Sequence, residues 1–431
     1  MSVNPDSDPN GYLFPLDKGV PDDITAFPIR DVPQRGWNVL REDLPLPVAT
    51  INAVALEHNS RWMREFIASH DVALAPHGKT SMAPALFDLQ IRDGAWGITL
   101  STPHQVSVAL STGYRRILVA NQIVGRAGVS QMFRAIADHP DLDLYCLIDS
   151  TALVEHMEAI ATDMGATRRL KVLVEKGFDN GRTGSRTVQG AVAVARSVNA
   201  SRHLQLAGIE GFEGILRREN PEQTLLAIND FLASIVEVAE ACDREGLFSG
   251  PILLSAGGSA YFDLVVEVFR KAHLTVDTTI MLRSGCYITH DSGLYVTAFN
   301  QIRQRAPDLL RGGGLQSALS VWGYVQSVPE PTRAIVGIGT RDVGGDRMPV
   351  PEAWFRPRSG MTGPEPMPSG HTVIALNDQH GFMTVPIDTP LAVGDMIAFG
   401  VSHPCLTFDK WRVLHVIDEA HNVISSVRTY F

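Results

Sequence analysis

A lysine that follows a short apolar run is the first residue in this chain whose type and position suit covalent chemistry. Lys79 lies in the segment Pro76–Thr80, directly after residues 72–75. A lysine at the end of a buried strand can point into a site, where partial burial lowers its pKa and makes the amine a better nucleophile and general base. A solvated surface lysine is the alternative interpretation, because most lysines are exposed.

A pair of glycines is the second candidate. Gly257 and Gly258 stand between Ser255 and Ser259, in and after the apolar run that begins at Ile252. Consecutive glycines allow backbone N–H groups to approach an anion closely, and the flanking hydroxyls add donors. A phosphate site in the late loops is a recurring feature of eight-stranded α/β barrels. A tight turn without a ligand is the alternative interpretation.

A histidine and a cysteine near the end of the chain form the third candidate. His403 and Cys405 are separated by Pro404. If this segment is extended, residues two apart point to the same side, and imidazole and thiolate together suit zinc. Two ligands do not make a closed structural site, but they suffice for an open one that water, substrate or a distant residue completes. A buried thiol beside an unrelated histidine is the alternative.

Further polar residues stand where predicted strands end. Arg182, in the polar loop 179–184, can hydrogen-bond an oxygen of a cofactor, or it can face solvent in a turn. The others are His77, Gln122, Glu210, Arg283, Gly285 and Tyr287. In a barrel, the C-terminal ends of the strands surround one site, so we expect these side chains to gather there.

The elements that must position these residues are short apolar or β-branched runs separated by amphipathic stretches. The runs are 72–75, 96–100, 117–120, 144–148, 170–174, 204–209, 252–255 and 279–282. Stretches such as 53–69, 151–164 and 221–245 predict helices between or before them. Regular alternation predicts a parallel sheet, and eight units in roughly 250 residues predict a closed (β/α)₈ TIM barrel. A doubly wound open sheet is the competing architecture.

The chain divides into three predicted parts. Residues 1–46 are rich in Pro, Asp and Gly and predict an extension that packs on a β-domain. Residues 47–303 form the barrel, and residues 304–431 form a C-terminal antiparallel β-rich domain with runs at 334–338, 372–376, 396–399 and 411–417. The Pro-rich segment 349–368 predicts an irregular loop.

Composition narrows the class of function. The net charge is −10 and no cluster of Lys and Arg is present, which argues against a nucleic-acid partner. No apolar run is long enough to cross a membrane, and residues 1–10 lack the regions of a signal peptide. The four cysteines lie far apart and do not resemble a disulfide framework. We therefore expect a cytoplasmic protein.

Together these segments resemble the alanine-racemase-like (fold type III) enzymes that use pyridoxal 5′-phosphate (PLP), and most closely the branch containing D-serine dehydratase and D-threonine aldolase. Residues 76–80 resemble its lysine signature, and residues 282–287, followed by 290–291, resemble its eighth-strand motif. Residues 378–381 and 402–405 resemble the two C-terminal motifs that flank its metal site. The resemblance covers residues 47–431.

The resemblance implies both a fold and a set of ligands. It implies a TIM barrel with a β-rich C-terminal domain, in which Lys79 carries PLP and Gly257, Gly258 and neighbouring hydroxyls hold its phosphate. It implies that His403 and Cys405 bind Zn²⁺, or another divalent metal, beside the substrate, and that the protein is a homodimer. In this branch an Asp in place of the cysteine accompanies aldolase activity, so Cys405 favours a dehydratase.

The resulting hypothesis is a D-serine dehydratase (deaminase) that converts D-serine, or a related D-β-hydroxy amino acid, to a 2-oxo acid and ammonia. A D-threonine aldolase or an amino-acid racemase on the same fold is the alternative. A non-catalytic PLP-binding carrier is less favoured, because single-domain carriers lack the C-terminal domain. A metal-only barrel hydrolase is also less favoured, because His77 is the single histidine among the predicted strand ends.

Overall fold

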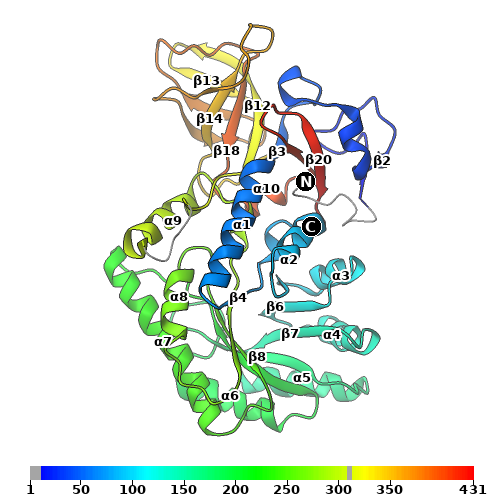
Figure 1. Ribbon diagram of the computed structural model, residues 1–431, viewed down its shortest axis with the longest axis vertical. Helices are drawn as coiled ribbons and strands as arrows, with labels where there is room; N and C mark the ends of the chain where they lie inside the picture. Colours follow the sequence, from blue (N-terminus) through cyan, green and yellow to red (C-terminus); the bar gives the residue numbers. More distant parts are fainter. Residues whose placement is uncertain (1–10, 308–312) are drawn as a thin grey trace.

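The computed structural model describes residues 11–307 and 313–431, which form two bodies built on two β-sheets. Figure 1 shows the larger body below, where helices surround one sheet, and the smaller, β-rich body above it. Residues 1–10 of the N-terminal extension and residues 308–312 of the C-terminal part lie outside the described residues.

The larger body is a barrel of eight parallel strands. The strands are β4 (Ala73–Leu74), β5 (Ile98–Leu100), β6 (Arg116–Gln122), β7 (Asp143–Ile148), β8 (Leu170–Lys176), β9 (Leu204–Gly211), β10 (Ile252–Ala256) and β11 (Thr278–Leu282). Hydrogen bonds join them in the order β4-β11-β10-β9-β8-β7-β6-β5. A parallel bridge between His77 and Thr99 links the ends of β4 and β5, so the sheet closes on itself. The predicted (β/α)₈ class is confirmed, and the open doubly wound sheet is excluded.

Helices cover the outside of this barrel. They are α1 (Ala53–Ser69), α2 (Pro84–Arg92), α3 (Pro103–Ser111), α4 (Arg126–Asp138), α5 (Thr151–Asp163), α6 (Val188–Ala200), α7 (Pro221–Arg244) and α8 (Phe262–Phe269). The strands are apolar on both faces because one face packs on these helices and the other fills the barrel. Leu118, Leu173 and Met281 belong to the cluster that fills the interior.

The second sheet has ten strands. They are β3 (Val48–Asn52), β12 (Leu319–Glu330), β13 (Arg333–Val336), β14 (Val350–Phe355), β15 (Glu365–Pro366), β16 (Thr372–Leu376), β17 (Gly381–Thr384), β18 (Met396–Gly400), β19 (Val413–Ile417) and β20 (Val423–Arg428). Helix α9 (Leu294–Arg305) leads toward this sheet from the barrel, and the short helix α10 (Cys405–Phe408) follows β18.

Two details of this sheet differ from the sequence prediction. Strand β3 pairs with β12 and β19, so residues 48–52 belong to the second sheet although the predicted barrel began at residue 47. The segment predicted as an irregular loop contains β14 and β15. A register shift after Pro351 accommodates the proline within β14, and Pro366 stands on the edge strand β15, where a missing N–H costs little.

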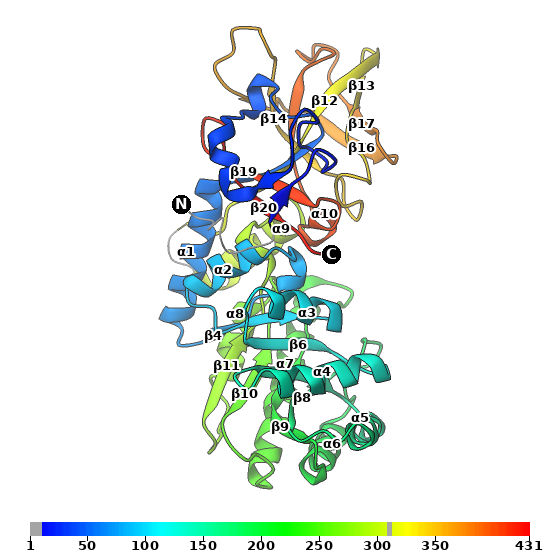
Figure 2. The same cartoon turned by 90° about the vertical axis from the view of Figure 1, so that its right-hand side faces the viewer.

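The described part of the N-terminal extension lies against the second sheet (Figure 2). It contains the two-residue strands β1 (Tyr12–Leu13) and β2 (Phe27–Pro28) and the 3₁₀ turns Ile29–Arg35 and Val39–Arg41. Leu13, Phe27 and Trp37 pack with Trp322 of β12 in one buried cluster. The Arg428 guanidinium of β20 donates to the Asp17 carboxylate at 2.8 Å, which fixes the extension to the C-terminal strand.

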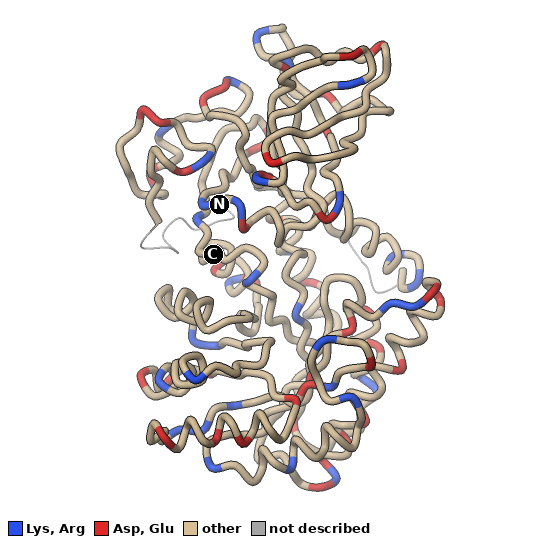
Figure 3. Tube along the Cα trace, turned by 180° about the vertical axis from the view of Figure 1, so that it is seen from behind, with Lys and Arg blue, Asp and Glu red and all other residues tan. Residues whose placement is uncertain are grey.

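The surface mixes charges of both signs. Lys and Arg alternate with Asp and Glu along the helices and loops in Figure 3. Among the described residues, no helix has both the length and the apolar character needed to span a membrane.

Candidate active site

A cavity of about 1240 Å³ lies where the C-terminal ends of the barrel strands face the second body. Its lining combines residues that follow barrel strands, residues of α9, and three further residues of the C-terminal domain, Arg347, His403 and Cys405. The lining holds seven Lys or Arg side chains and three Glu side chains. The cavity is therefore suited to a ligand with negative charge.

Lys79 lines this cavity from a single 3₁₀ turn, Gly78–Thr80, that follows β4. The backbone at Gly285, on a neighbouring chain segment, packs directly against the start of this turn. A Cβ at Gly285 would lie only 2.6 Å from the carbonyl oxygen of His77. Only glycine allows these two backbones to approach so closely. The Lys79 side chain is exposed to the cavity rather than packed.

Glu210 and Arg283 form a buried ion pair at the floor of the cavity. The Arg283 guanidinium also donates to the carbonyl oxygen of Gly211 at 2.8 Å. Burial raises the pKa of Glu210 to about 7, although the positive charge of Arg283 acts in the opposite direction. Burial, together with the charges of Lys79 and Arg283, lowers the pKa of His77 well below the ordinary histidine value, so its ring is neutral.

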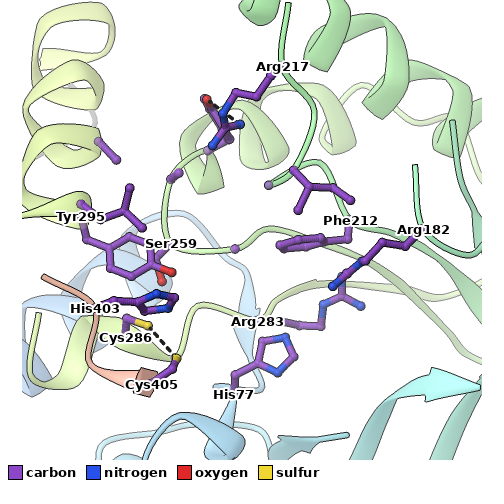
Figure 4. A pocket seen from close by; sticks show the side chains of 18 of the residues that line it. His77, Arg182, Phe212, Arg217, Ser259, Arg283, Cys286, Tyr295, His403 and Cys405 are labelled. Atoms are coloured by element: carbon purple, nitrogen blue, oxygen red, sulfur yellow. Dashed lines mark hydrogen bonds between the residues drawn. The ribbon is translucent and has the colours of Figure 1, made fainter. Parts of the chain in front are cut away.

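Four buried polar atoms around this floor have no hydrogen-bond partner among the described residues. They are His77 Nδ1, Gln122 Oε1, Glu210 Oε1 and Arg283 Nε. Unsatisfied buried polar atoms cost free energy, and four of them at one place indicate that a polar ligand satisfies them. Figure 4 shows His77 and Arg283 close together on one side of the pocket, with Arg182 and Phe212 beside them. The residues present therefore fit a flat, polar, anionic cofactor such as PLP.

Two further predicted residues border this floor. The Gln122 side-chain amide donates to Glu175, which also accepts a hydrogen bond from Thr183 Oγ1 at 3.0 Å. The Arg182 guanidinium lies 4.8 Å from the centre of the Phe212 ring. This contact turns Arg182 toward the cavity rather than toward solvent, because a cation is attracted to the ring face.

The glycine pair has an unexpected partner. The backbone N–H groups of Gly257 and Gly258 donate to the two carboxylate oxygens of Glu213, at 3.1 Å and 3.0 Å. These amides do form an anion cradle, and in the structure the anion is a side chain of the protein. Gly258 and Ser259 line the cavity, whereas Gly257 is not part of its lining.

Two other predicted cofactor residues also lie outside the cavity lining. The Ser255 hydroxyl, within β10, donates to the carbonyl oxygen of Met281 at 3.1 Å. The Tyr287 hydroxyl pairs with Gln90 of α2, so its ring points into the core. Both positions were inferred from their place in a motif. Within a strand or a turn, however, only alternate side chains face the cavity.

A cluster of three metal-ligating side chains stands on the opposite side of the pocket. One ligand atom from each of Cys286, His403 and Cys405 lies within 4.8 Å of the other two. The two Sγ atoms are 3.6 Å apart, and Figure 4 shows the His403 ring above them. The Thr80 hydroxyl accepts a hydrogen bond from the Cys405 thiol at 3.4 Å, so the residue next to Lys79 touches this cluster.

Neighbouring residues orient the His403 ring and lower the pKa of the Cys405 thiol, and both effects favour metal binding. The carboxylate of Asp346 accepts a hydrogen bond from His403 Nδ1 at 3.1 Å, which leaves Nε2 available as a ligand. The hydrogen bond from Cys286, supported by His403, lowers the pKa of Cys405 well below the ordinary thiol value. The same hydrogen bond and burial raise the pKa of Cys286.

The predicted geometry of this motif differs from the observed one. Pro404 is helical and Cys405 begins α10, so the segment is a turn and not an extended strand. His403 and Cys405 nevertheless point to the same cluster. His380, in the turn between β16 and β17, is exposed and is not a member of it.

Several residues in the cavity lining or in contact with it were not identified from the sequence as functional. Cys286 and Tyr295 line the cavity beside the metal-ligating cluster, and Asp346 holds His403. Glu213 fills the glycine cradle. Cys286 and Glu213 both follow predicted strands closely, which was a usable signal, whereas Tyr295 and Asp346 reach the site only through the tertiary arrangement of α9 and the loop after β13.

Comparison with known proteins gives consistent results. Residues 318–417 match the family model described as a putative serine dehydratase domain. The chain is similar to the 3-hydroxy-D-aspartate aldolase of Paracoccus denitrificans, with 22% identity over 323 residues, which is 74% of this chain and 76% of the relative.

The fold is similar to that of several solved structures. The D-threonine aldolase of Filomicrobium marinum superposes with a TM-score of 0.75 and 21% identity, over 91% of this chain and 97% of the other. The D-threo-3-hydroxyaspartate dehydratase of Delftia sp. HT23 superposes with a TM-score of 0.70 and 20% identity, over 91% and 99% of the two chains. A cysteine-to-alanine mutant of a protein of that name was solved in a metal-free form.

More distant structures share the same architecture. Alanine racemase from Bacillus anthracis superposes with a TM-score of 0.58 and 13% identity, over 89% of this chain and 97% of the other. The chain therefore has the fold of alanine racemase, a barrel joined to a β-rich domain, and it is similar in sequence to D-threonine aldolase and to D-3-hydroxyaspartate aldolase and dehydratase.

Proposed function

We propose that this protein is a metal-assisted, PLP-dependent lyase that dehydrates and deaminates D-serine or a related D-β-hydroxy amino acid. One observation carries the proposal. Lys79 and the metal-ligating cluster line one cavity, and Thr80 connects them through its contact with Cys405. A base for the α-proton and a metal for the β-hydroxyl then act on the same small molecule.

The residues at the cavity floor fit PLP, and each has a defined task. Lys79 would carry the cofactor and, once the substrate amine replaces it, would take the proton from the α-carbon at Nζ. Ser259 and the excess of positive side chains would receive the phosphate. Gln122, Arg182, Glu210 and Arg283, with neutral His77, would orient the ring. When bound, PLP supplies an electron sink for the charge that develops at the α-carbon.

The metal-ligating cluster would act on the β-carbon side of the substrate. His403 and Cys405 fit Zn²⁺, because imidazole and thiolate are its preferred ligands. A divalent metal supplies a Lewis acid that polarises the β-hydroxyl. Tyr295 lies in edge contact with His403, with ring centres 5.8 Å apart, and borders the same space. Loss of water from D-serine followed by hydrolysis of the enamine balances to pyruvate and ammonia.

An aldolase is the second candidate. The relatives named above include two aldolases, and an aldolase would use the same lysine and the same metal to split the bond between the α- and β-carbons. Arg347, exposed beside Asp346 and lining the cavity, favours a substrate that has a second carboxylate, such as 3-hydroxy-D-aspartate, for either reaction.

Product analysis after incubation with single amino acids tests the proposal. The purified protein, loaded with PLP and Zn²⁺, is incubated separately with D-serine, D-threonine and 3-hydroxy-D-aspartate, with L-serine as the control. We expect a 2-oxo acid and ammonia in equal amounts from a D-substrate, and none from L-serine. Glycine with an aldehyde would establish the aldolase, and inversion at the α-carbon would establish a racemase. Bound PLP without turnover of any amino acid would favour a carrier.

The assembly belongs to the same proposal. We propose a cytoplasmic homodimer in which the partner chain helps to close the cavity. Light scattering of the loaded protein measures the mass directly, and a value equal to one chain contradicts the dimer.

A further inference from the structure

We propose that Cys286 is a third protein ligand of the metal, so that the site is a Cys₂His centre with one open position. The inference goes beyond the proposed function, because it concerns the ligands of the metal and holds whichever D-amino acid is the substrate. It adds to His403 and Cys405 a residue from a different body of the protein.

The distance between the two sulfur atoms supports this ligand set. Two thiolates bound to one tetrahedral zinc, each about 2.3 Å from it, lie about 3.8 Å from each other. Cys286 Sγ and Cys405 Sγ are 3.6 Å apart, and the His403 ligand atom is within 4.8 Å of both. A small inward movement of the imidazole completes the three corners of a tetrahedron.

The two cysteines each begin a short helical element. Cys286 begins the 3₁₀ turn Cys286–Ile288 that follows β11, and Cys405 begins α10. They are 119 residues apart in sequence. The Thr80 hydroxyl lies 3.4 Å from Cys405 Sγ and 4.0 Å from Cys286 Sγ, so the turn that carries Lys79 supports both sulfur atoms.

The cluster faces the cavity, which defines the fourth position. All three side chains line the cavity, and Tyr295 borders the same space. Three protein ligands with one open position is the arrangement of catalytic zinc sites, and a Cys₂His set with an open position occurs in alcohol dehydrogenase, where the handling of a hydroxyl is the chemistry. The β-hydroxyl oxygen of the substrate, or a water in its place, is the ligand that fits here.

A second thiolate ligand affects both the metal selectivity of the site and its affinity for the metal. Two thiolates and a neutral imidazole balance the charge of a divalent ion, and soft sulfur ligands favour Zn²⁺ over Mg²⁺ or Mn²⁺. We therefore expect tighter retention of Zn²⁺ than two protein ligands alone provide, and no replacement of Zn²⁺ by Mg²⁺.

X-ray absorption spectroscopy of the zinc-loaded, PLP-containing protein counts the sulfur ligands directly. We expect two sulfur atoms at the zinc in the unmodified protein, and one in Cys286→Ala. Cys242→Ala, which removes a buried thiol of α7 far along the chain from the cluster, is the matched control and should keep two. Competition with a zinc chelator should give a dissociation constant at least tenfold higher for Cys286→Ala than for Cys242→Ala.

The unmodified protein alone decides the question even if a variant does not fold. One sulfur atom at the zinc, or no zinc bound after loading, overturns the inference. A disulfide between Cys286 and Cys405 that mass spectrometry detects in the zinc-loaded protein also overturns it. Because none of these measurements involves turnover, a wrong proposed function and a wrong ligand set give different results.

Discussion

The carboxylate of Glu213 accepts the backbone N–H of Gly258 at 3.0 Å and, through its other oxygen, the N–H of Gly257 at 3.1 Å. Glu213 follows β9 and is fully buried, so it joins the end of one barrel strand to the loop after the next one. The loop after β10, which borders the cavity, is therefore fixed before any ligand arrives.

This contact predicts a loss of cofactor affinity in Glu213→Gln. A neutral amide offers one acceptor where the carboxylate offers two, and a hydrogen bond to a charged group contributes about 1.5–3 kcal/mol. We expect the PLP dissociation constant to rise about tenfold, as measured by absorbance titration. Glu219→Gln, which removes an exposed carboxylate from the cavity lining, is the control. Tighter PLP binding in Glu213→Gln would mean that the carboxylate competes with the phosphate.

Lys79→Ala should remove turnover of the D-substrate almost completely. The variant loses both the amine that carries the cofactor and the base for the α-proton, and a positioned general base alone contributes a factor of about 10²–10⁴. Lys271→Ala is the control, because Lys271 is exposed on the outside of the barrel and pairs with Glu267 at 3.0 Å. More than a tenth of the original rate of 2-oxo acid release in Lys79→Ala would rule out the assigned role.

The barrel strands and helix α1 could be predicted from the sequence, whereas the sheet to which β3 belongs could not. Barrel strands are covered on both faces, so all eight appear as apolar runs, and each predicted run overlaps one of β4–β11. Helix α1 has the predicted bounds, and the Asn52 side chain caps it by accepting from the Ala55 N–H at 2.9 Å. Residues 48–52 fall within the predicted barrel bounds but form β3 of the second sheet, because their partner β12 begins only at Leu319 and no local pattern indicates so distant a partner.

The candidate site was predictable only in part. Lys79 and Arg283 follow strands directly, so the barrel pattern alone brings them to one rim. The position of Cys405 beside Cys286 depends on how the C-terminal domain sits on the barrel, which no local pattern encodes. The partner of Gly257 and Gly258 could not be predicted for a similar reason. The sequence indicates that two backbone N–H groups can bind an anion, but it does not show whether that anion is a ligand or a side chain of the protein.

Asp346→Asn should weaken metal binding without removing a ligand. Asp346 accepts the hydrogen bond from His403 Nδ1 and so orients the imidazole and raises its basicity. Loss of such a partner costs about 10–100-fold in metal affinity, and we expect a change of this size in the zinc dissociation constant. Asp378→Asn, an exposed residue in the turn between β16 and β17, is the control. Equal zinc affinities in the two variants would show that Asp346 does not support the ligand.

A buried histidine far from the cavity predicts how stability depends on pH. His415 of β19 lies between the Ser426 hydroxyl at 2.8 Å and the carbonyl oxygen of Gly19 at 3.0 Å, and burial lowers its pKa from 6.5 to about 4. The unfolded chain therefore binds a proton between these pH values that the folded chain excludes. Stability from His415 is complete above pH 6.5 and is lost as the pH falls toward 4, by about 3 kcal/mol in total. Urea unfolding followed by tryptophan fluorescence measures this loss, and Trp37, whose ring contacts His415, is one of the six tryptophans that contribute to the signal. We expect a shallower pH dependence in His415→Gln, and an unchanged one in the control His104→Gln, which alters an exposed histidine. Parallel curves for His415→Gln and the unmodified protein would mean that His415 is already charged in the folded state.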